Sequence, residues 1–79
     1  MSVCRVEFVI EPFTDGTPGS HVRAGIQAME SQGLDVTMGP FGSIVEGDTA
    51  SVATAIGSMV RSAIDDGAVR VLVEVTTTS

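Results

Sequence analysis

The sequence predicts an α+β protein whose elements follow the order βαββαβ. Residues alternate between apolar and polar at both ends of the chain, as in strands that are buried on one face. Two segments between them repeat apolar residues at helical spacing, and Gly39-Pro40 interrupts a pair of strand-like runs. Right-handed crossovers then place both helices on one face of a four-stranded antiparallel sheet. This arrangement is the ferredoxin-like sandwich.

The first strand is expected from Val3 to Glu11, where apolar and polar residues alternate. Pro12 ends it, because proline has no N–H to donate to a neighbouring strand. The period of two assigns one face of this strand to the core beneath the helices. That face consists of Cys4, Val6, Phe8 and Ile10.

The first helix is expected to begin after Ser20, a residue type that caps helix N-termini, and to stop at Gly33. A second strand follows from Leu34 to Met38, and Gly39-Pro40 breaks it. The buried stripe of the helix is expected to contain Val22, Ile26 and Met29.

The third strand is expected from about Phe41 to Glu46, and Gly47-Asp48 turns the chain toward the second helix. Asp48 or Thr49 caps that helix, and Asp65-Asp66-Gly67 ends it. This order places Glu46 at a strand end that faces a helix start. The buried stripe of the second helix is expected to be Val52, Ile56, Met59 or Val60, and Ala63 or Ile64.

The last strand alternates four valines, which should meet the helices, with residues of the open sheet face. The valines are Val69, Val71, Val73 and Val75. The open face carries Arg5, Glu7, Val9, Arg70, Leu72 and Glu74. Arginines and glutamates on neighbouring strands can pair there. A half-apolar, charge-paired face on so small a protein favours a subunit interface over a solvated sheet face.

The length of 79 residues predicts one domain, residues 1–79. A domain of this size buries only about 60% of its unfolded surface, so it needs additional stabilisation. Cys4 is the single cysteine and His21 the single histidine, which excludes an intrachain disulfide and a Cys/His zinc cluster. Self-association remains, and we expect a homodimer or homotetramer formed through the sheet.

The net charge of −6, with ten acidic against four basic residues, is unsuited to phosphate contacts. We therefore expect no nucleic-acid partner, whereas a small cationic ligand would be attracted. The first residues lack the features of a signal peptide, and no apolar run approaches the length of a membrane span. The expected location is cytoplasmic, with no membrane association.

The residues suggest no catalytic machinery, no cofactor and no metal, because no nucleophile–base pair or ligand cluster can be drawn. Ser43 and Glu46 are the strongest site candidates, since they lie on or beside a short apolar strand in the middle of the sheet. An exposed strand-end position for Glu46 is about equally compatible with the residues. Three residues near chain reversals either pack in the core or line a pocket mouth: Phe13, Met38 and Phe41.

His21, at the start of the first helix, is either a neutral hydrogen-bonding imidazole or an ordinary surface residue.

The order of motifs resembles the YkoF-like thiamine-binding family of small cytoplasmic proteins. The most distinctive motif is the Gly-[Thr/Ser]-x-x-Glu-Gly segment, and the likeness covers nearly the whole chain. The matching segments are Val6-Glu7-Phe8-Val9-Ile10-Glu11-Pro12, Val22 and Ile26, Gly42-Ser43-Ile44-Val45-Glu46-Gly47-Asp48, and Gly67-Ala68-Val69-Arg70-Val71.

The resemblance implies a non-enzymatic protein that binds thiamine or its hydroxymethylpyrimidine part and assembles through its sheets. Ser43 and Glu46 take the positions of the family's hydroxyl and carboxylate, and Gly42 lets the backbone approach the ligand. Phe41 and Ser43 depart from the usual methionine-like and threonine residues. The alternative is a regulatory or structural oligomeric module of this fold that senses another metabolite. The remaining predicted ligand-binding residues are Phe13, Phe41, Met38 and His21.

Overall fold

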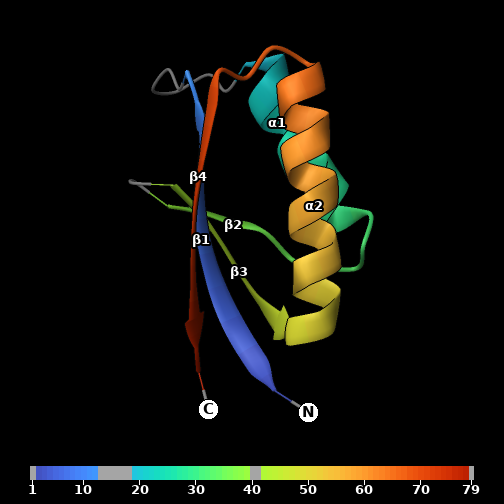
Figure 1. Cartoon of the computed structure of the whole chain (residues 1–79), viewed down its shortest axis with the longest axis vertical. Coiled ribbons are helices and arrows are strands. Elements are labelled where there is room, and N and C mark those ends of the chain that lie inside the picture. Colours follow the sequence, from blue (N-terminus) through green and yellow to red (C-terminus); the bar gives the residue numbers. More distant parts are fainter. Residues whose placement is uncertain (1, 13–18, 40–41, 79) are drawn as a thin grey trace.

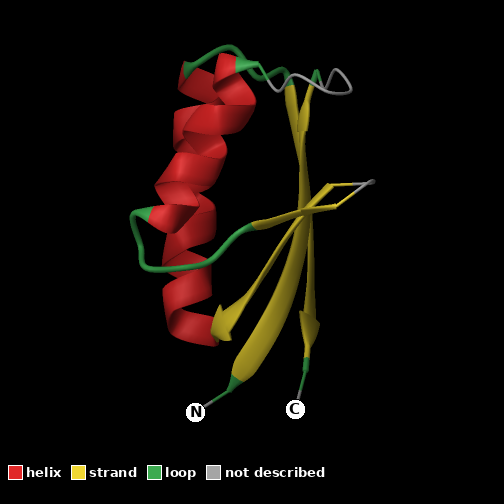
Figure 2. Cartoon of the chain, turned by 180° about the vertical axis from the view of Figure 1, so that it is seen from behind, coloured by secondary structure: helices red, strands yellow, loops and turns green. Residues whose placement is uncertain are grey.

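In the computed structural model, which describes residues 2–12, 19–39 and 42–78, two helices lie side by side on one face of a single sheet (Figures 1 and 2). Neither of these helices lies on the opposite face of the sheet. The elements, in chain order, are β1 (Val3–Glu11), α1 (Ser20–Glu30), β2 (Thr37–Gly39), β3 (Gly42–Asp48), α2 (Thr49–Asp65) and β4 (Arg70–Thr77).

The sheet confirms the predicted fold class. Its strand order is β2-β3-β1-β4, and all three neighbouring pairs are antiparallel. The first strand is therefore central and pairs with both the third and the last strand. This order, with two helices on one face, is that of a ferredoxin-like sandwich. In the register, Val6 lies opposite Val45 on one side and Val75 on the other.

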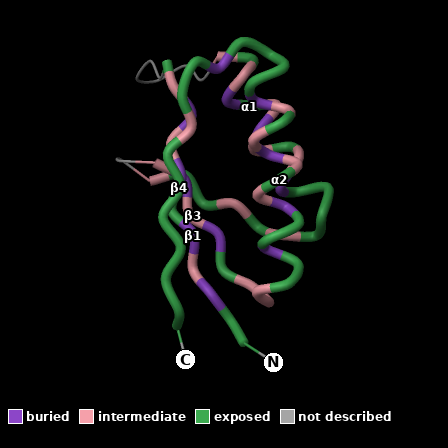
Figure 3. Tube along the Cα trace, viewed as in Figure 1, coloured by how far each residue is buried: buried purple, intermediate pink, exposed green. Residues whose placement is uncertain are grey.

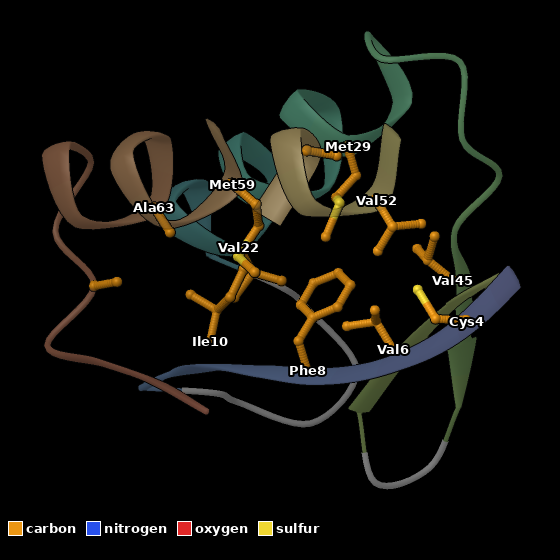
Figure 4. Close-up of a cluster of buried hydrophobic side chains, with 12 residues drawn as sticks. Cys4, Val6, Phe8, Ile10, Val22, Met29, Val45, Val52, Met59 and Ala63 are labelled. Atoms are coloured by element: carbon orange, nitrogen blue, oxygen red, sulfur yellow. The ribbon is translucent and has the colours of Figure 1, made fainter. Parts of the chain in front are cut away.

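The core lies between the sheet and the two helices and confirms the predicted face of β1 (Figure 4). Phe8 is at its centre and only 2% exposed, with Met29 of α1 and Met59 of α2 above it, both fully buried. The period of two in β1 and the helical stripes thus meet as expected. The remaining core residues are Cys4, Val6, Ile10, Val22, Val45, Val52, Ala55, Ala63 and Ala68.

Three predicted boundaries were wrong. The second strand covers Thr37–Gly39 and not residues 34–38, because Leu34 and Val36 pack against the core before the chain joins the sheet. The third strand continues to Asp48, since all of its residues from Ser43 onward pair with β1. The N-cap of α1 is Gly19, and Ser20 is already the first helical residue.

The last strand corrects the prediction that its four valines are covered by the helices. Val71 packs against the core, but Val73 and Val75 are 37% and 51% exposed, and Val69 is 78% exposed. Val73 and Val75 face the helix side as predicted, because they lie opposite the core residues Phe8 and Val6 of β1, whereas Val69 precedes β4 and is outside the register. However, β4 is the outer strand, and the helices cover β1 more fully than this edge. Exposure therefore extends along most of β4 (Figure 3).

Of the two predicted caps of α2, Asp48 and Thr49, the structure shows Asp48. Its Oδ2 accepts a hydrogen bond of 3.1 Å from the Ser51 backbone N–H. Replacing Asp48 with alanine removes this acceptor, so we expect a loss of about 1 kcal/mol in the free energy of unfolding. Asp48→Asn retains a capping oxygen and should stay within a few tenths of a kcal/mol of the wild type. Urea denaturation followed by helix circular dichroism measures both variants, and equal losses would contradict capping.

Candidate functional site

Ser43 is the one buried polar residue of the described core, with 5% of its surface exposed. It is on the helix side of β3, because it lies opposite the core residue Phe8 in β1. On its other side it lies opposite Met38 of β2. The side chain therefore lies between two apolar neighbours, and no buried side-chain nitrogen or oxygen atom among the described residues lacks a hydrogen-bond partner. A hydroxyl beside apolar side chains can both donate to and accept from the polar edge of a flat ligand.

Gly42 precedes Ser43 and has a backbone conformation that side chains rarely adopt, with φ of +149°. A Cβ atom at this position would lie 2.8 Å from the carbonyl oxygen of Phe8 and 2.9 Å from Cγ2 of Val9. The close approach of β3 to β1 at this point therefore requires glycine. Gly42 fixes the backbone from which Ser43 extends.

Glu46 lies on the other face of the sheet from Ser43. It is exposed and stands opposite Arg5, whose neighbours in the strand are core residues. Successive strand side chains alternate between faces, so residues three apart point in opposite directions. The prediction that Glu46 ends a strand and faces a helix start was wrong, because β3 continues through Gly47 and Asp48. One ligand in one subunit cannot contact both Ser43 and Glu46 from the same side.

The charges around Glu46 form a mixed cluster on the open face. Arg5 Nη1 is 3.1 Å from Glu7 Oε1, and Glu74 lies directly opposite Glu7 in the register. Near the other end of the strands, Arg70 Nη1 is 3.6 Å from Glu11 Oε1. The predicted pairing across strands is thus present for Arg70, whereas Arg5 pairs within its own strand. Carboxylates outnumber guanidinium groups around Arg5, so this part of the face would attract a cation.

The other predicted site residues are not gathered at one point. Met38 is 47% exposed and adjoins Ser43. His21 is at the first turn of α1, and its Nε2 is within hydrogen-bonding distance of the Pro12 carbonyl oxygen, away from Ser43. Phe13 and Phe41 lie outside the described residues. The structure therefore brings together Ser43, Gly42 and Met38.

Two neighbours of the candidate residues could not be found from sequence patterns. Phe8 adjoins Ser43, and Arg5 adjoins Glu46, because of the register between β1 and β3. Strands so far apart in the chain carry no local signal for their relative alignment. The alternation within β3, by contrast, was visible in the sequence and already separates positions 43 and 46 by face.

A shallow depression of about 430 Å³ lies between the two helices, on the surface turned away from the sheet. It contains none of the predicted site residues. Its lining consists of small or uncharged residues: Ala24, Gln27, Ala28, Ser31, Gln32, Ser58 and Ser62. In the part of the chain that the structure describes, no group of three or more His, Cys, Asp or Glu side chains is arranged to hold a metal ion.

Comparison with protein families supplies the decisive observation. The family model described as thiamine-binding protein matches residues 6–78, which include every described residue of the Ser43 and Glu46 surroundings except Arg5. The chain belongs to the thiamine-binding protein family. The resemblance identified from its motifs is thereby confirmed.

Solved structures confirm the fold of this family member. A hypothetical protein from Methanocaldococcus jannaschii matches with a TM-score of 0.72 and 19% identity, covering 100% of this chain and 81% of the other. A domain of unknown function (DUF77) from Bacillus cereus matches with a TM-score of 0.71 and 16% identity, covering 99% and 76%. A Thermotoga maritima protein, a candidate in thiamine biosynthesis or salvage, matches with a TM-score of 0.69 and 19% identity, covering 98% and 83%.

Comparison with curated proteins gives no match. Among the described residues of this thiamine-binding family member, neither helix has the length and hydrophobicity that crossing a bilayer requires.

Proposed function

We propose that the protein binds thiamine, or its hydroxymethylpyrimidine part, in the cytoplasm and catalyses no reaction. Membership of a thiamine-binding family supports the ligand class. The observation that carries the proposal is the position of Ser43, the one buried polar residue of the described core, between Phe8 and Met38. The proposed ligand-binding set is Ser43, Gly42, Met38, Glu46, His21, Phe13 and Phe41.

Ser43 is suited to the pyrimidine part of the ligand. The aminopyrimidine ring presents nitrogen acceptors at its edge and apolar faces above and below. The Ser43 hydroxyl donates to a ring nitrogen, and the side chain of Met38 contacts the ring face from the neighbouring strand. Gly42 leaves space beside the backbone because it has no side chain.

Glu46 is suited to the thiazolium part, which carries a permanent positive charge. Its carboxylate is exposed on the open face, near the other acidic residues that surround Arg5. Because Ser43 is on the opposite side of β3, Glu46 does not contact a ligand at the Ser43 hydroxyl, and its carboxylate instead attracts the cation to the open face of the sheet. The two side chains therefore make separable contributions to binding.

Calorimetric titration with thiamine and with hydroxymethylpyrimidine tests these roles. Ser43→Ala is expected to weaken both ligands by about threefold to tenfold, because it removes one buried hydrogen bond. Glu46→Gln is expected to weaken thiamine alone, by up to about fivefold, because only thiamine carries the cation. Glu30→Gln is the matched control, since it removes one carboxylate from the exposed surface of α1.

Three outcomes would contradict the proposal or one of its residue assignments. No heat and no thermal shift with either ligand, for a folded wild-type protein, would exclude thiamine-type binding. Equal affinities in the wild type and Ser43→Ala would remove Ser43 from the site. If Glu30→Gln and Glu46→Gln weaken thiamine binding equally, Glu46 acts only through the net charge of the protein and has no specific contact with the ligand.

The open face is proposed to assemble with a second copy. On this face Val9 and Leu72 lie opposite each other, with Leu72 43% exposed, and Val3, 42% exposed, lies at the other end of β1 beyond the charged cluster. Apolar residues on both sides of a charged cluster are compatible with a subunit interface. Contact through the open face would also place Glu46 of one subunit against the open face of the other, on the side of the sheet away from Ser43.

A regulatory or structural module that senses another metabolite is the second candidate. The placement of Ser43 and Glu46 on opposite faces favours it, because a single compact pocket in one subunit would need both on the same side. A protein that assembles but gives no thermal shift with either pyrimidine ligand would favour this second function over the first.

A further inference from the structure

Met38 is the exposed sulfur-containing residue of the part of the chain that the structure describes. It is 47% exposed, whereas Met29 and Met59 are fully buried and Cys4 is only 2% exposed. The fourth methionine, Met1, lies outside the described residues. Oxidation of methionine to its sulfoxide requires access of the oxidant to the sulfur atom. An oxidant in solution therefore reaches the described methionines at very different rates, with Met38 first.

The exposure of Met38 follows from its place at the edge of the sheet. Its strand, β2, is an outer strand of 3 described residues and pairs with β3 alone. Met38 faces the helix side, because it lies opposite Ser43, which in turn lies opposite the core residue Phe8. Phe8 is buried beneath the helices, but Met38 remains open to solvent on the same face. Its side chain therefore adjoins both Ser43 and the solvent.

Met38 is close enough to Ser43 for a chemical change at the sulfur to alter the hydroxyl. The two residues are direct partners in neighbouring antiparallel strands, so their Cβ atoms lie about 4.5–5.5 Å apart. The sulfur is two bonds beyond the Met38 Cβ, and an oxygen atom added to it comes within reach of the Ser43 hydroxyl. A thioether sulfur is a weak acceptor, whereas a sulfoxide group is polar and its oxygen carries negative charge.

We propose that Met38 is an oxidative modification site that switches off ligand binding at Ser43. The oxidant is a peroxide: hydrogen peroxide transfers one oxygen atom to Sδ, its O–O bond breaks, and water is released. The sulfur loses two electrons, which the peroxide gains. The sulfoxide makes the apolar wall of the site polar. Its oxygen also accepts the hydrogen bond that the Ser43 hydroxyl otherwise donates to the ring nitrogen.

The burial of the other methionines keeps this modification local. Met29 and Met59 pack above Phe8 in the core, where a sulfoxide would be a polar group among apolar side chains (Figure 4). The oxygen added to Met38 reaches solvent or the Ser43 hydroxyl instead. We therefore expect protein oxidised at Met38 to keep its helix circular dichroism and its urea midpoint, so that a loss of affinity reports on the site.

The loss of binding rests on the proposed function, because it requires a pyrimidine ligand at Ser43. The selectivity of oxidation for Met38 rests on burial alone. Two measurements therefore test the two parts separately.

Mass spectrometry after brief treatment with dilute hydrogen peroxide measures the selectivity. Cleavage after glutamate separates the three described methionines, because Glu30 and Glu46 lie between them. The peptide of residues 31–46 is expected to gain one oxygen atom about tenfold faster than the peptides that contain Met29 and Met59, or faster still. Saturating hydroxymethylpyrimidine should slow this oxidation, because the bound ring covers the sulfur.

Calorimetric titration with hydroxymethylpyrimidine, after removal of the peroxide, measures the effect on binding. Protein oxidised at Met38 is expected to bind about tenfold more weakly than untreated protein. Methionine sulfoxide reductases for both epimers, with dithiothreitol as the reductant, should restore the affinity. In Ser43→Ala the loss on oxidation should fall to about threefold, because the hydroxyl for which the sulfoxide competes is absent.

Met38→Leu is the matched control for damage elsewhere in the chain. It has no sulfur at this position, so its affinity for hydroxymethylpyrimidine should be the same before and after peroxide treatment. An equal loss of affinity in this variant and in the wild type would assign the effect to another residue and overturn the proposal. If Met38→Leu does not fold, recovery of the wild-type affinity as residues 31–46 lose the added oxygen still assigns the effect to Met38.

Failure of this switch is distinguishable from failure of the proposed function. Oxidised and untreated protein that bind hydroxymethylpyrimidine equally would overturn the switch and leave the proposed function intact. Oxidation of Met29 or Met59 at the rate of Met38 would do the same. Untreated, folded protein that gives no heat and no thermal shift with this ligand or with thiamine would overturn the proposed function, and the switch with it.

Discussion

Replacing Phe8 with alanine is expected to lower the free energy of unfolding by about 3–5 kcal/mol. Phe8 is among the largest of the fully buried side chains and lies at the centre of the core, with 2% of its surface exposed. Met29 and Met59 pack above it from the two helices (Figure 4). Removing the ring deletes buried apolar area and leaves a cavity that the surrounding strands and helices cannot fully close. A domain of this size has a total stability of roughly 4–12 kcal/mol, so the variant should be largely unfolded or close to it.

Urea denaturation at one protein concentration measures this loss, with helix circular dichroism as the probe because the chain has no tryptophan or tyrosine. A fixed concentration is required because self-association would add to the apparent stability. The matched control is Val3→Ala in the same strand. Val3 is on the open face and 42% exposed, so its loss should be within about 0.5 kcal/mol. Similar losses in both variants would contradict the central position of Phe8.

Much of this core could be predicted from the sequence, because alternation in β1 reports directly which side chains share a face. Cys4, Val6, Phe8 and Ile10 were predicted as core and are buried. The same pattern in β4 assigned its valines to the correct face but not to the correct depth. Whether a strand face is covered depends on where the helices lie across the sheet. That is a property of packing between distant segments, and alternation carries no information about it.

The candidate site shows the same division between local and distant information. The sequence identified Ser43 and Glu46, and the period of two already implied that they point to opposite faces. The resemblance to a family directed attention to their shared motif, and a single site was inferred from it. The structure places them on opposite faces of the sheet, so one ligand cannot contact both from the same side. The neighbours that give each side chain its chemistry, Phe8 beside Ser43 and Arg5 beside Glu46, depend on the register of β1 and β3.

Gly42 is the residue of this region for which the structure makes the strongest prediction after Phe8. Gly42→Ala is expected to lower the free energy of unfolding by about 2–4 kcal/mol, for two reasons. Its φ of +149° is strained for any residue with a side chain. In addition, the new Cβ would meet the backbone oxygen of Phe8 at 2.8 Å. Relief requires β3 to move away from β1, because a backbone atom cannot rotate aside as a side chain can.

The same substitution at Gly57 serves as the control and should have the opposite sign. Gly57 is an exposed residue of α2, and a Cβ atom there would have no atom within 4 Å. Alanine is the better helix former, so Gly57→Ala should stabilise the protein by about 0.5–1 kcal/mol. Urea denaturation of the two variants, one midpoint falling and the other rising, compares an identical chemical change in two backbone environments. A urea midpoint for Gly42→Ala at or above that of the wild type would show that β3 approaches β1 less closely than the 2.8 Å contact with the Phe8 oxygen implies. Ser43 would then not be held between Phe8 and Met38, and its hydroxyl would lose the buried position on which its proposed role in binding depends.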